Sequence, residues 1–270
     1  MAGGLCPGFL FLRRKKGRGV ARMKKVLFFT ACILFTLAGG AQAYYDLSLG
    51  GNFSYPIYSI VNTGSGPQAE SYGGGSVDTS SLNGATLPWV YCVDFIKVVY
   101  VPGDYASTTT NNAGFIYGQQ LPYAAQVAWL LTNENPTSGQ GDQQKALQAA
   151  IWTVINDGLV NPLENQSKNY VYQLDPTQSS STVVADYEKY LDDVITYGKS
   201  GGNIANFIWM TPGTSDSNGQ VVDYQGLVTA RNSLTGEGFE TPIPAAGWLL
   251  GAGLLGITGL RRKYSGWAPR

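Results

Sequence analysis

The residue of this chain best suited to covalent chemistry is a cysteine. The sequence contains Cys6, Cys32 and Cys92, and it contains no histidine. The first two cysteines lie in a segment that we expect to be removed on export, so the mature protein keeps one thiol and has no partner for an internal disulfide. The lack of histidine excludes a cysteine–histidine pair, a serine–histidine–aspartate triad and a histidine-ligated metal site. Cys92 is therefore a buried apolar residue, an intermolecular bridge or a reactive group.

Two stretches surround the candidate chemistry. Cys92 lies in Pro88–Phe95, a run of aromatic and β-branched residues that predicts a β-strand. If the thiol reacts, the candidate partner is Gln148, in the stretch Ala146–Trp152. Gln148, Trp152 and Ile155 share one stripe of a predicted helix, so the glutamine is expected to stack beside the Trp152 ring.

These stretches resemble the two signature motifs of bacterial surface thioester domains. The first motif places an aromatic residue before the cysteine and an apolar residue after it, as in Tyr91-Cys92-Val93. The second reads apolar-Gln-x-x-apolar-Trp, as in Leu147 to Trp152. The resemblance spans roughly residues 45–227, although outside the motifs it is one of pattern only. It implies an internal thioester between the Cys92 sulfur and the Gln148 carbonyl, formed with loss of ammonia.

Such a thioester needs help from the fold. Amide resonance protects a carboxamide from thiols, and holding the two groups in near-attack contact contributes roughly 7–11 kcal/mol. The aromatic side chains of Trp89, Tyr91 and Trp152, together with Phe95, are expected to shield the bond from water. Other glutamines compete as partners, namely Gln126, Gln143 and Gln144, but none has a tryptophan four residues later. The plain alternative is that Cys92 is a small core residue, since free cysteine is among the most buried residue types.

The N-terminus predicts export. Residues 24–25 are basic, residues 26–37 are apolar, and Ala41-Gln42-Ala43 is a small-x-small cleavage site. This pattern is typical of a secretory signal peptide that signal peptidase removes. Met23 opens the pattern, so we expect the true start there and assign residues 1–43 to leader and signal peptide. A twin-arginine signal and a lipoprotein cysteine at Cys32 are poorer alternatives.

The C-terminus resembles a PEP-CTERM sorting signal of the VPLPA type. A proline motif, Pro242-Ile243-Pro244-Ala245, precedes an apolar run from Ala245 to Leu260 and the basic residues Arg261 and Arg262. At 16 residues, the run falls short of the ~20 that span a bilayer. The resemblance implies that residues 241–270 are a membrane-inserted helix processed by an exosortase. This places the protein on the surface or in the biofilm matrix of a Gram-negative bacterium.

The segment between these ends is strongly acidic. Residues 44–240 contain 18 acidic and six basic side chains, a net charge of −12, whereas the whole chain sums to zero. A body of this charge will not bind nucleic acid or anionic lipid through general electrostatics. The sequence has no calcium-loop pattern, and we expect neither a cofactor nor a metal.

Residues 44–240 predict a single α+β domain. Strands are expected at 44–61, 87–95, 96–101, 204–210 and 221–228, with a Gly/Ser-rich loop at 62–81. Helices are expected at 121–132, at 143–156 with Asp142 as N-cap, and at 182–197. The resemblance to thioester domains implies a β subdomain that carries Cys92 and a helical subdomain that carries Gln148.

Three functions fit these observations. The first is a surface adhesin, not an enzyme, whose thioester attaches covalently to an amine or hydroxyl on a partner protein or polysaccharide. The second is a chemically inert structural component of the exopolysaccharide matrix with the same sorting tail. The third is a hydrolase, which would need a pair of carboxylates because histidine is absent, and no spacing singles out such a pair.

Overall fold

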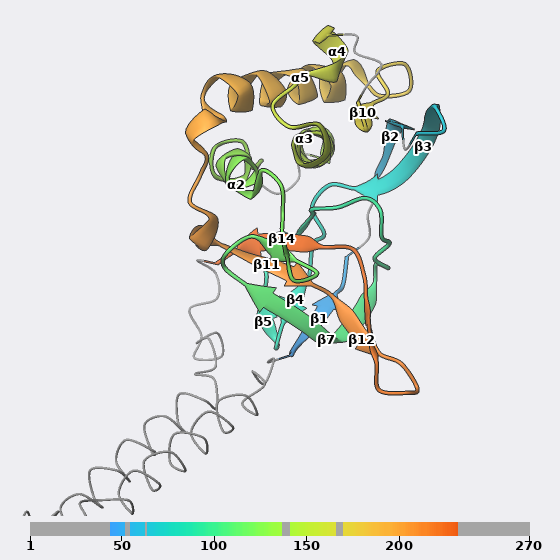
Figure 1. Ribbon diagram of the computed structural model, residues 1–270, viewed down its shortest axis with the longest axis vertical. Coiled ribbons are helices and arrows are strands. Elements are labelled where there is room, and N and C mark those ends of the chain that lie inside the picture. The colour runs from blue at the N-terminus through green and yellow to red at the C-terminus, as the bar shows by residue number, and fades with distance from the viewer. Residues whose placement is uncertain (1–43, 52–54, 63, 137–140, 166–169, 232–270) are drawn as a thin grey trace, which may run out of the picture. The chain divides into compact units, whose positions relative to one another are not determined.

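The computed structural model describes residues 44–51, 55–62, 64–136, 141–165 and 170–231 (Figure 1). All of them belong to one compact unit of the chain. The expected signal peptide and the expected sorting tail, including the cleavage site and the proline motif, lie outside the described residues. Among the described helices, none is long and apolar enough to cross a membrane.

The largest element is an antiparallel sheet of seven strands. Its order is β5-β4-β1-β7-β11-β14-β6. In that order the strands are Ala85–Thr86, Ser81–Leu82, Tyr45–Leu49, Gly103–Asn111, Phe207–Thr211, Leu227–Ala230 and Tyr91–Cys92. Strand β11 is buried along its whole length. Strand β1 instead alternates buried and less buried residues, so the sheet has one face against the core along that strand.

Smaller sheets complete the β structure. Strands β10 (Tyr172–Leu174), β2 (Tyr55–Asn62) and β3 (Pro67–Gly74) form a three-stranded sheet in that order. Two hairpins are formed by β8 (Phe115–Ile116) with β9 (Gln119–Gln120), and by β12 (Gly213–Ser215) with β13 (Val221–Asp223). The β8–β9 turn places Tyr117 and Gly118 at φ values of 55° and 71°. That left-handed pair is the geometry of a tight two-residue hairpin turn.

Three longer helices lie together beside the seven-stranded sheet in Figure 1. They are α2 (Ala124–Asn133), α3 (Gly141–Asp157) and α5 (Ser181–Thr196), and a single turn, α4 (Pro162–Asn165), follows α3. Short 3-10 turns occupy Gly198–Ser200 and Ile204–Asn206. Helix α5 begins where the Ser180 hydroxyl accepts a hydrogen bond from Val183 N, which satisfies one free amide of its first turn.

Helix α3 lies at the centre of the core. All but one of its residues from Gln144 to Ile155 are buried, on every side of the helix, and the exception is Lys145. A helix that is buried all round must be covered by several elements. Helix α3 packs on α2, α5 and β10 and reaches the β2–β3 hairpin and β6. It therefore joins the helices to the two larger sheets.

The structure confirms a mixed helix and strand fold and the three long helices of the sequence prediction. Residues Val183, Tyr187, Leu191 and Val194 form the buried face of α5, as their spacing predicts. Two details of the helices were wrong. Helix α3 begins at Gly141, so Asp142 lies within its first turn and is not the N-cap. Tyr123, expected on the buried face, precedes α2 in a left-handed conformation and is 47% exposed.

The strand predictions were less accurate. The expected loop at 62–81 contains β3, which pairs with β2 along its full length. The expected strands at 87–95 and 96–101 reduce to the two residues of β6, whereas the long β7 follows directly after them. Residues 96–101 are apolar apart from Lys97, but only Val99 among them is buried, and they have no strand partner in the described sheets. The prediction from hydrophobicity therefore placed a strand at 96–101, whereas the long strand is the next segment, β7.

Candidate functional site

Cys92 lies on the edge of the seven-stranded sheet. Strand β6 is the last in the order and pairs only with β14, where Cys92 is opposite Leu227. The next residue, Val93, donates its amide to Gly226 O at 2.8 Å. In an extended chain the polar groups of successive residues point to opposite edges. The amide and carbonyl of Cys92 therefore face away from β14, where the sheet order has no further strand.

Gln148 occupies this open edge. Its side-chain Oε1 accepts a hydrogen bond from Cys92 N at 2.9 Å, and its Nε2 donates to Cys92 O at 2.7 Å. The carboxamide thus pairs with one residue of β6 much as a peptide group of a neighbouring strand would. Both residues are fully buried. The structure brings together the two residues that the sequence motifs single out.

The thiol of Cys92 is neutral in this environment. Desolvation by complete burial raises its pKa well above the ordinary value of 9.0, and the negative charge of Asp94 raises it further. Cys92 is also the one cysteine within the described residues, and it is free. Low pKa and exposure are what make a thiol reactive toward outside reagents. Cys92 has neither, so it can react only with a group already in contact with it.

A cluster of four aromatic rings lies beside the glutamine. Trp152, one turn after Gln148, packs edge-on against Tyr72 and Tyr172 with ring centroids 5.6 and 5.5 Å apart. Phe95 contacts Tyr72 and Tyr172 at 6.2 and 5.5 Å. Three of the four rings are buried, and Tyr72 is partly exposed. The cluster therefore reaches the surface at Tyr72.

The other two proposed shielding residues lie elsewhere. The Trp89 and Tyr91 rings contact each other at 5.6 Å, and Trp89 also contacts Phe207. Because side chains alternate along a strand, Tyr91 projects from the face of β6 opposite to Cys92. Its hydroxyl donates to Asn135 Oδ1 at 3.1 Å. The pair covers the sheet rather than the thiol itself.

The chain passes very close to Gln148 at Gly74. A Cβ atom placed on Gly74 would lie 2.1 Å from Ile57 Cδ1 and 3.5 Å from Gln148 Cγ. The adjoining Gly75, at φ 95°, lies against Gln144, whose Cβ would be 3.5 Å from an added side chain. Glycine is needed at the end of β3 because a side chain on Gly74 would meet Ile57 and because Gly75 has a left-handed φ, and both residues lie in ordinary contact with the two glutamines. This close approach was not predicted, although three successive glycines at 73–75 were a signal for it.

The competing glutamines do not reach the cysteine amide. Gln144 is buried on α3 one turn before Gln148, next to Gly75. Gln126 donates to Lys199 O, and Gln143 is only half-buried. Gln148 is the glutamine whose hydrogen bonds join it to Cys92.

Sequence analysis missed Asp94, which has the densest hydrogen bonding near the site. Its Oδ1 accepts from Ile96 N and Lys97 N at 2.9 and 3.0 Å. Its Oδ2 accepts from Gly226 N at 2.8 Å and from the Tyr117 hydroxyl. An aspartate that ends a strand and bonds amides two and three residues later is a recognisable turn signal. Tyr117, 23 residues away, has no such signal.

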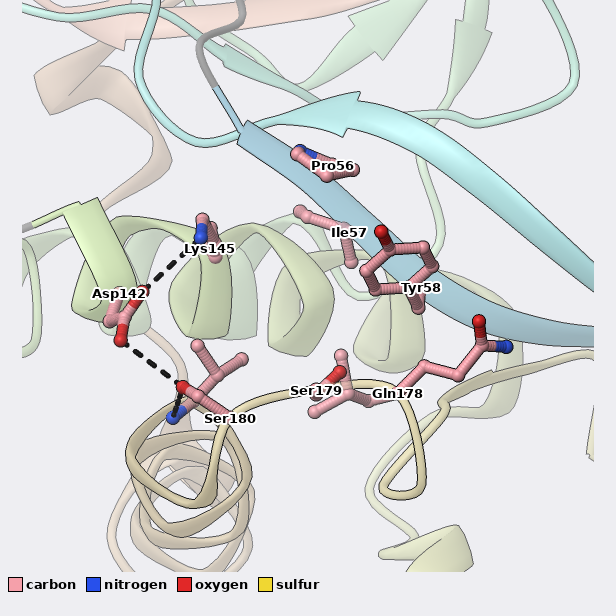
Figure 2. A pocket seen from close by; sticks show the side chains of 10 residues that line it. Pro56, Ile57, Tyr58, Asp142, Lys145, Gln178, Ser179 and Ser180 are labelled. Carbon is pink, nitrogen blue, oxygen red and sulfur yellow. Dashed lines mark hydrogen bonds and ion pairs between the residues drawn. The ribbon is translucent and has the colours of Figure 1, made fainter.

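A small pocket of about 110 Å³ opens near the start of α3 (Figure 2). Asp142 lies on its wall, accepting from Lys145 Nζ at 3.2 Å and from Ser180 Oγ at 3.1 Å. Ile57 also lines it, and that side chain reaches the Gly74 segment which covers Gln148. Neither Cys92 nor Gln148 lines the pocket. Within the described residues, no cluster of acidic and cysteine side chains could hold a metal ion.

Comparison of the chain with family models, curated proteins and solved structures found no match in any of the three.

Proposed function

We propose that this is an exported surface protein that carries an internal thioester between Cys92 and Gln148 and uses it to attach covalently to a partner. The observation behind this proposal is the paired hydrogen bonding of the Gln148 carboxamide to both backbone groups of Cys92. In this reading, the seven-stranded sheet is the β subdomain that presents the cysteine, and α2, α3 and α5 are the helical subdomain that presents the glutamine.

The arrangement of the carboxamide favours attack by the sulfur. Its two hydrogen bonds run in the direction of strand pairing, so the amide plane lies near the plane of the sheet. Side chains stand roughly perpendicular to a sheet, and the sulfur is three bonds from the amide nitrogen that holds Oε1. A sulfur that rotates toward Gln148 would approach the carbonyl carbon from outside the amide plane, the direction in which a nucleophile adds. The Cys92 N–H then stabilises the negative charge that develops on Oε1.

The reaction balances within the protein. The Cys92 sulfur bonds to Gln148 Cδ, the Cδ–Nε2 bond breaks, and the thiol proton leaves with Nε2 as ammonia. No oxidant or other reactant is needed. The stored thioester then reacts with an amine or hydroxyl of the partner, whose atom bonds to Cδ while the proton passes to the sulfur. The partner ends joined through the Gln148 carbonyl, and the thiol is free.

One observation favours a second function, an inert matrix protein. A buried neutral thiol beside a glutamine whose amide oxygen and nitrogen each have a hydrogen-bond partner is also a stable structural arrangement. In that case Gln148 only closes the open edge of β6. The two functions differ in the presence of the Cys92–Gln148 thioester bond, which forms with loss of ammonia. The intact mass of the protein therefore decides between them.

The deciding experiment uses the full chain, exported from a bacterial host, with Cys92→Ala and Gln148→Ala made in the same way. After allowance for the substitutions, wild type should be one ammonia lighter than either variant. Methylamine should add to Gln148 of wild type alone and release a thiol that alkylating reagents reach. Full sequence mass in wild type, with no methylamine uptake, would leave the inert matrix protein as the function.

The surface location has its own test. We propose that residues 241–270 are a sorting signal, because a proline motif, an apolar run and Arg261-Arg262 follow one another there. Signal peptidase would act after Ala43, and an exosortase near Pro242–Ala245. Mass spectrometry of protein taken from the cell surface should find the C-terminus near the proline motif. A surface protein that still ends at Arg270 would refute the sorting signal without bearing on the thioester.

A further inference from the structure

Asp94 joins three segments of the chain at a point two residues from Cys92. Its carboxylate accepts four hydrogen bonds, two on each oxygen: from the amides of Ile96 and Lys97, from the amide of Gly226, and from the hydroxyl of Tyr117. An ionised carboxylate has about four acceptor sites. All are in use, which leaves no lone pair for a proton from the thiol. Asp94 is therefore not a general base for Cys92.

The backbone carbonyl of Asp94 makes the link to α3. It accepts a hydrogen bond from Trp152 Nε1 at 3.1 Å and another from Gln225 Nε2. Trp152 lies one turn after Gln148 on the same helix, and its ring is fully buried. The helix is thus bonded to the Cys92 segment at two points, Gln148 to Cys92 and Trp152 to Asp94. Two points of attachment fix both the distance and the rotation of α3 relative to β6.

Gly226, in the loop before β14, bonds the same segment through both of its backbone groups. Its carbonyl accepts from Val93 N at 2.8 Å, and its amide donates to Asp94 Oδ2 at 2.8 Å. Residues 92–94 are therefore bonded on one edge to the loop before β14 and on the other to α3. A shift of Asp94 would move Cys92 along or away from the Gln148 amide.

Tyr117 is held in a costly conformation that brings its hydroxyl to this point. Its φ of 55° is the left-handed region, which a residue with a Cβ adopts at a cost of about 1 kcal/mol or more. The hydroxyl donates to Asp94 and lies 2.8 Å from Tyr224 O, while Lys97 Nζ lies 3.9 Å from the ring centroid. Burial raises the pKa of Tyr117, so the phenol stays protonated and keeps its donor.

We propose that Asp94 is the positioning residue of the Cys92–Gln148 reaction: by bonding Tyr117 and Gly226 through its carboxylate and Trp152 through its carbonyl, it holds the cysteine segment in register with α3. This role rests on the proposed function. The proposal also gives a role to Trp152, the tryptophan of the second motif: its indole N–H donates the hydrogen bond that attaches α3 to Asp94 O. Misplacement of reacting groups by about 1 Å can slow a reaction on the order of a hundredfold.

The test compares Asp94→Asn with Asp157→Asn in the full chain. Asp157 is a matched control, because its carboxylate also accepts backbone amides, from Val171 N at 2.5 Å and Tyr172 N at 2.9 Å, at the far end of α3. An asparagine at either position keeps the shape but replaces one acceptor oxygen with a donor. Trp152→Phe is the second variant, since it keeps an aromatic ring and removes the N–H that bonds Asp94, together with some buried volume.

Two readouts separate positioning from stability. The first is the rate at which ammonia is lost after synthesis, which should fall about a hundredfold in Asp94→Asn, measurably in Trp152→Phe, and not in Asp157→Asn. The second is hydrogen exchange of the Cys92 amide, which should be faster in Asp94→Asn than in Asp157→Asn when the two are matched for free energy of unfolding by temperature.

The outcomes keep the two proposals apart. If wild type loses ammonia and Asp94→Asn loses it equally fast, the positioning role is wrong while the thioester stands. If wild type shows its full sequence mass, the thioester is wrong, and hydrogen exchange of the Cys92 amide alone tests whether Asp94 positions the cysteine segment. Equal exchange rates in Asp94→Asn and Asp157→Asn would then refute the positioning role.

Discussion

Helix α3 supports two polar regions that differ in their relation to water. At its first turn, Asp142 and Lys145 line an open pocket, and the Asp142 carboxylate bonds both Lys145 and Ser180 (Figure 2). One turn later, Gln148 lies fully buried, and its carboxamide bonds to the backbone of Cys92. The same helix thus offers a place that a ligand can enter and a place that it cannot.

The difference indicates that the buried pair is not a binding site in the ordinary sense. A polar group in the open pocket exchanges its partner for water at little cost, whereas a buried donor or acceptor without a partner costs about 1–3 kcal/mol. The Cys92–Gln148 contact is therefore kept closed by the fold. If the proposed thioester forms, a partner nucleophile reaches it only after a covering segment such as Gly74 has moved aside. A stored thioester needs that protection, because water is the competing nucleophile.

The largest effect that separates the two regions is on stability. Whether or not Nε2 has already left with the thioester, Gln148→Ala leaves the amide and carbonyl of Cys92 without a side-chain partner and opens a small cavity, so we expect the free energy of unfolding to fall by about 3–5 kcal/mol. Gln178→Ala is the matched control, since Gln178 lines the pocket, is exposed and donates to Asp175 Oδ2 at 2.8 Å. There the loss should stay within about 1 kcal/mol. Denaturant unfolding of both variants measures the difference.

Equal losses in the two glutamine variants would break the comparison. It would mean that water reaches the edge of β6 and replaces the lost amide. Cys92→Ala sharpens the test, because it keeps both backbone hydrogen bonds to Gln148. Its cost should be smaller than that of Gln148→Ala, even though it removes the sulfur of the proposed thioester.

The helices were predictable from sequence because each has a local signal. Val183, Tyr187, Leu191 and Val194 repeat at helical spacing, and Ser180 supplies a cap. The strands had weaker signals. Strand β7 contains Ser107 and four threonines or asparagines in its second half, which resemble a polar loop, yet it pairs with β1 and β11 in the middle of the sheet. Its place depends on partners far away in the sequence.

The candidate site divides in the same way. Cys92 and Gln148 could be named from two short motifs, and the structure places them in contact. The residues that hold the contact could not be named. Asp94 gains its meaning from Tyr117 and Gly226, which are 23 and 132 residues away. Sequence spacing says nothing about such hydrogen bonds, because they form only once the sheet and the helices have packed.

A smaller effect, on the pH dependence of stability, reports whether the thiol is free. A free Cys92 thiol has its pKa raised by burial above the ordinary 9.0, so the folded protein keeps a proton that the unfolded chain loses. Its contribution to stability is complete below pH 9.0 and is lost as pH rises toward the folded pKa, by about 1.4 kcal/mol per pH unit. A thioester has no thiol proton in either state and contributes no such slope.

Cys92→Ala isolates this effect from the buried tyrosines, whose pKa values are also raised by burial and which titrate in both proteins. Because we propose a thioester, the curves of unfolding free energy against pH for wild type and Cys92→Ala should run parallel above pH 9.0, with intact mass checked before and after each measurement. A steeper fall in wild type would show a free buried thiol. The Cys92–Gln148 contact would then resemble the Asp142 hydrogen bonds of the open pocket, where polar groups bond one another without any covalent link.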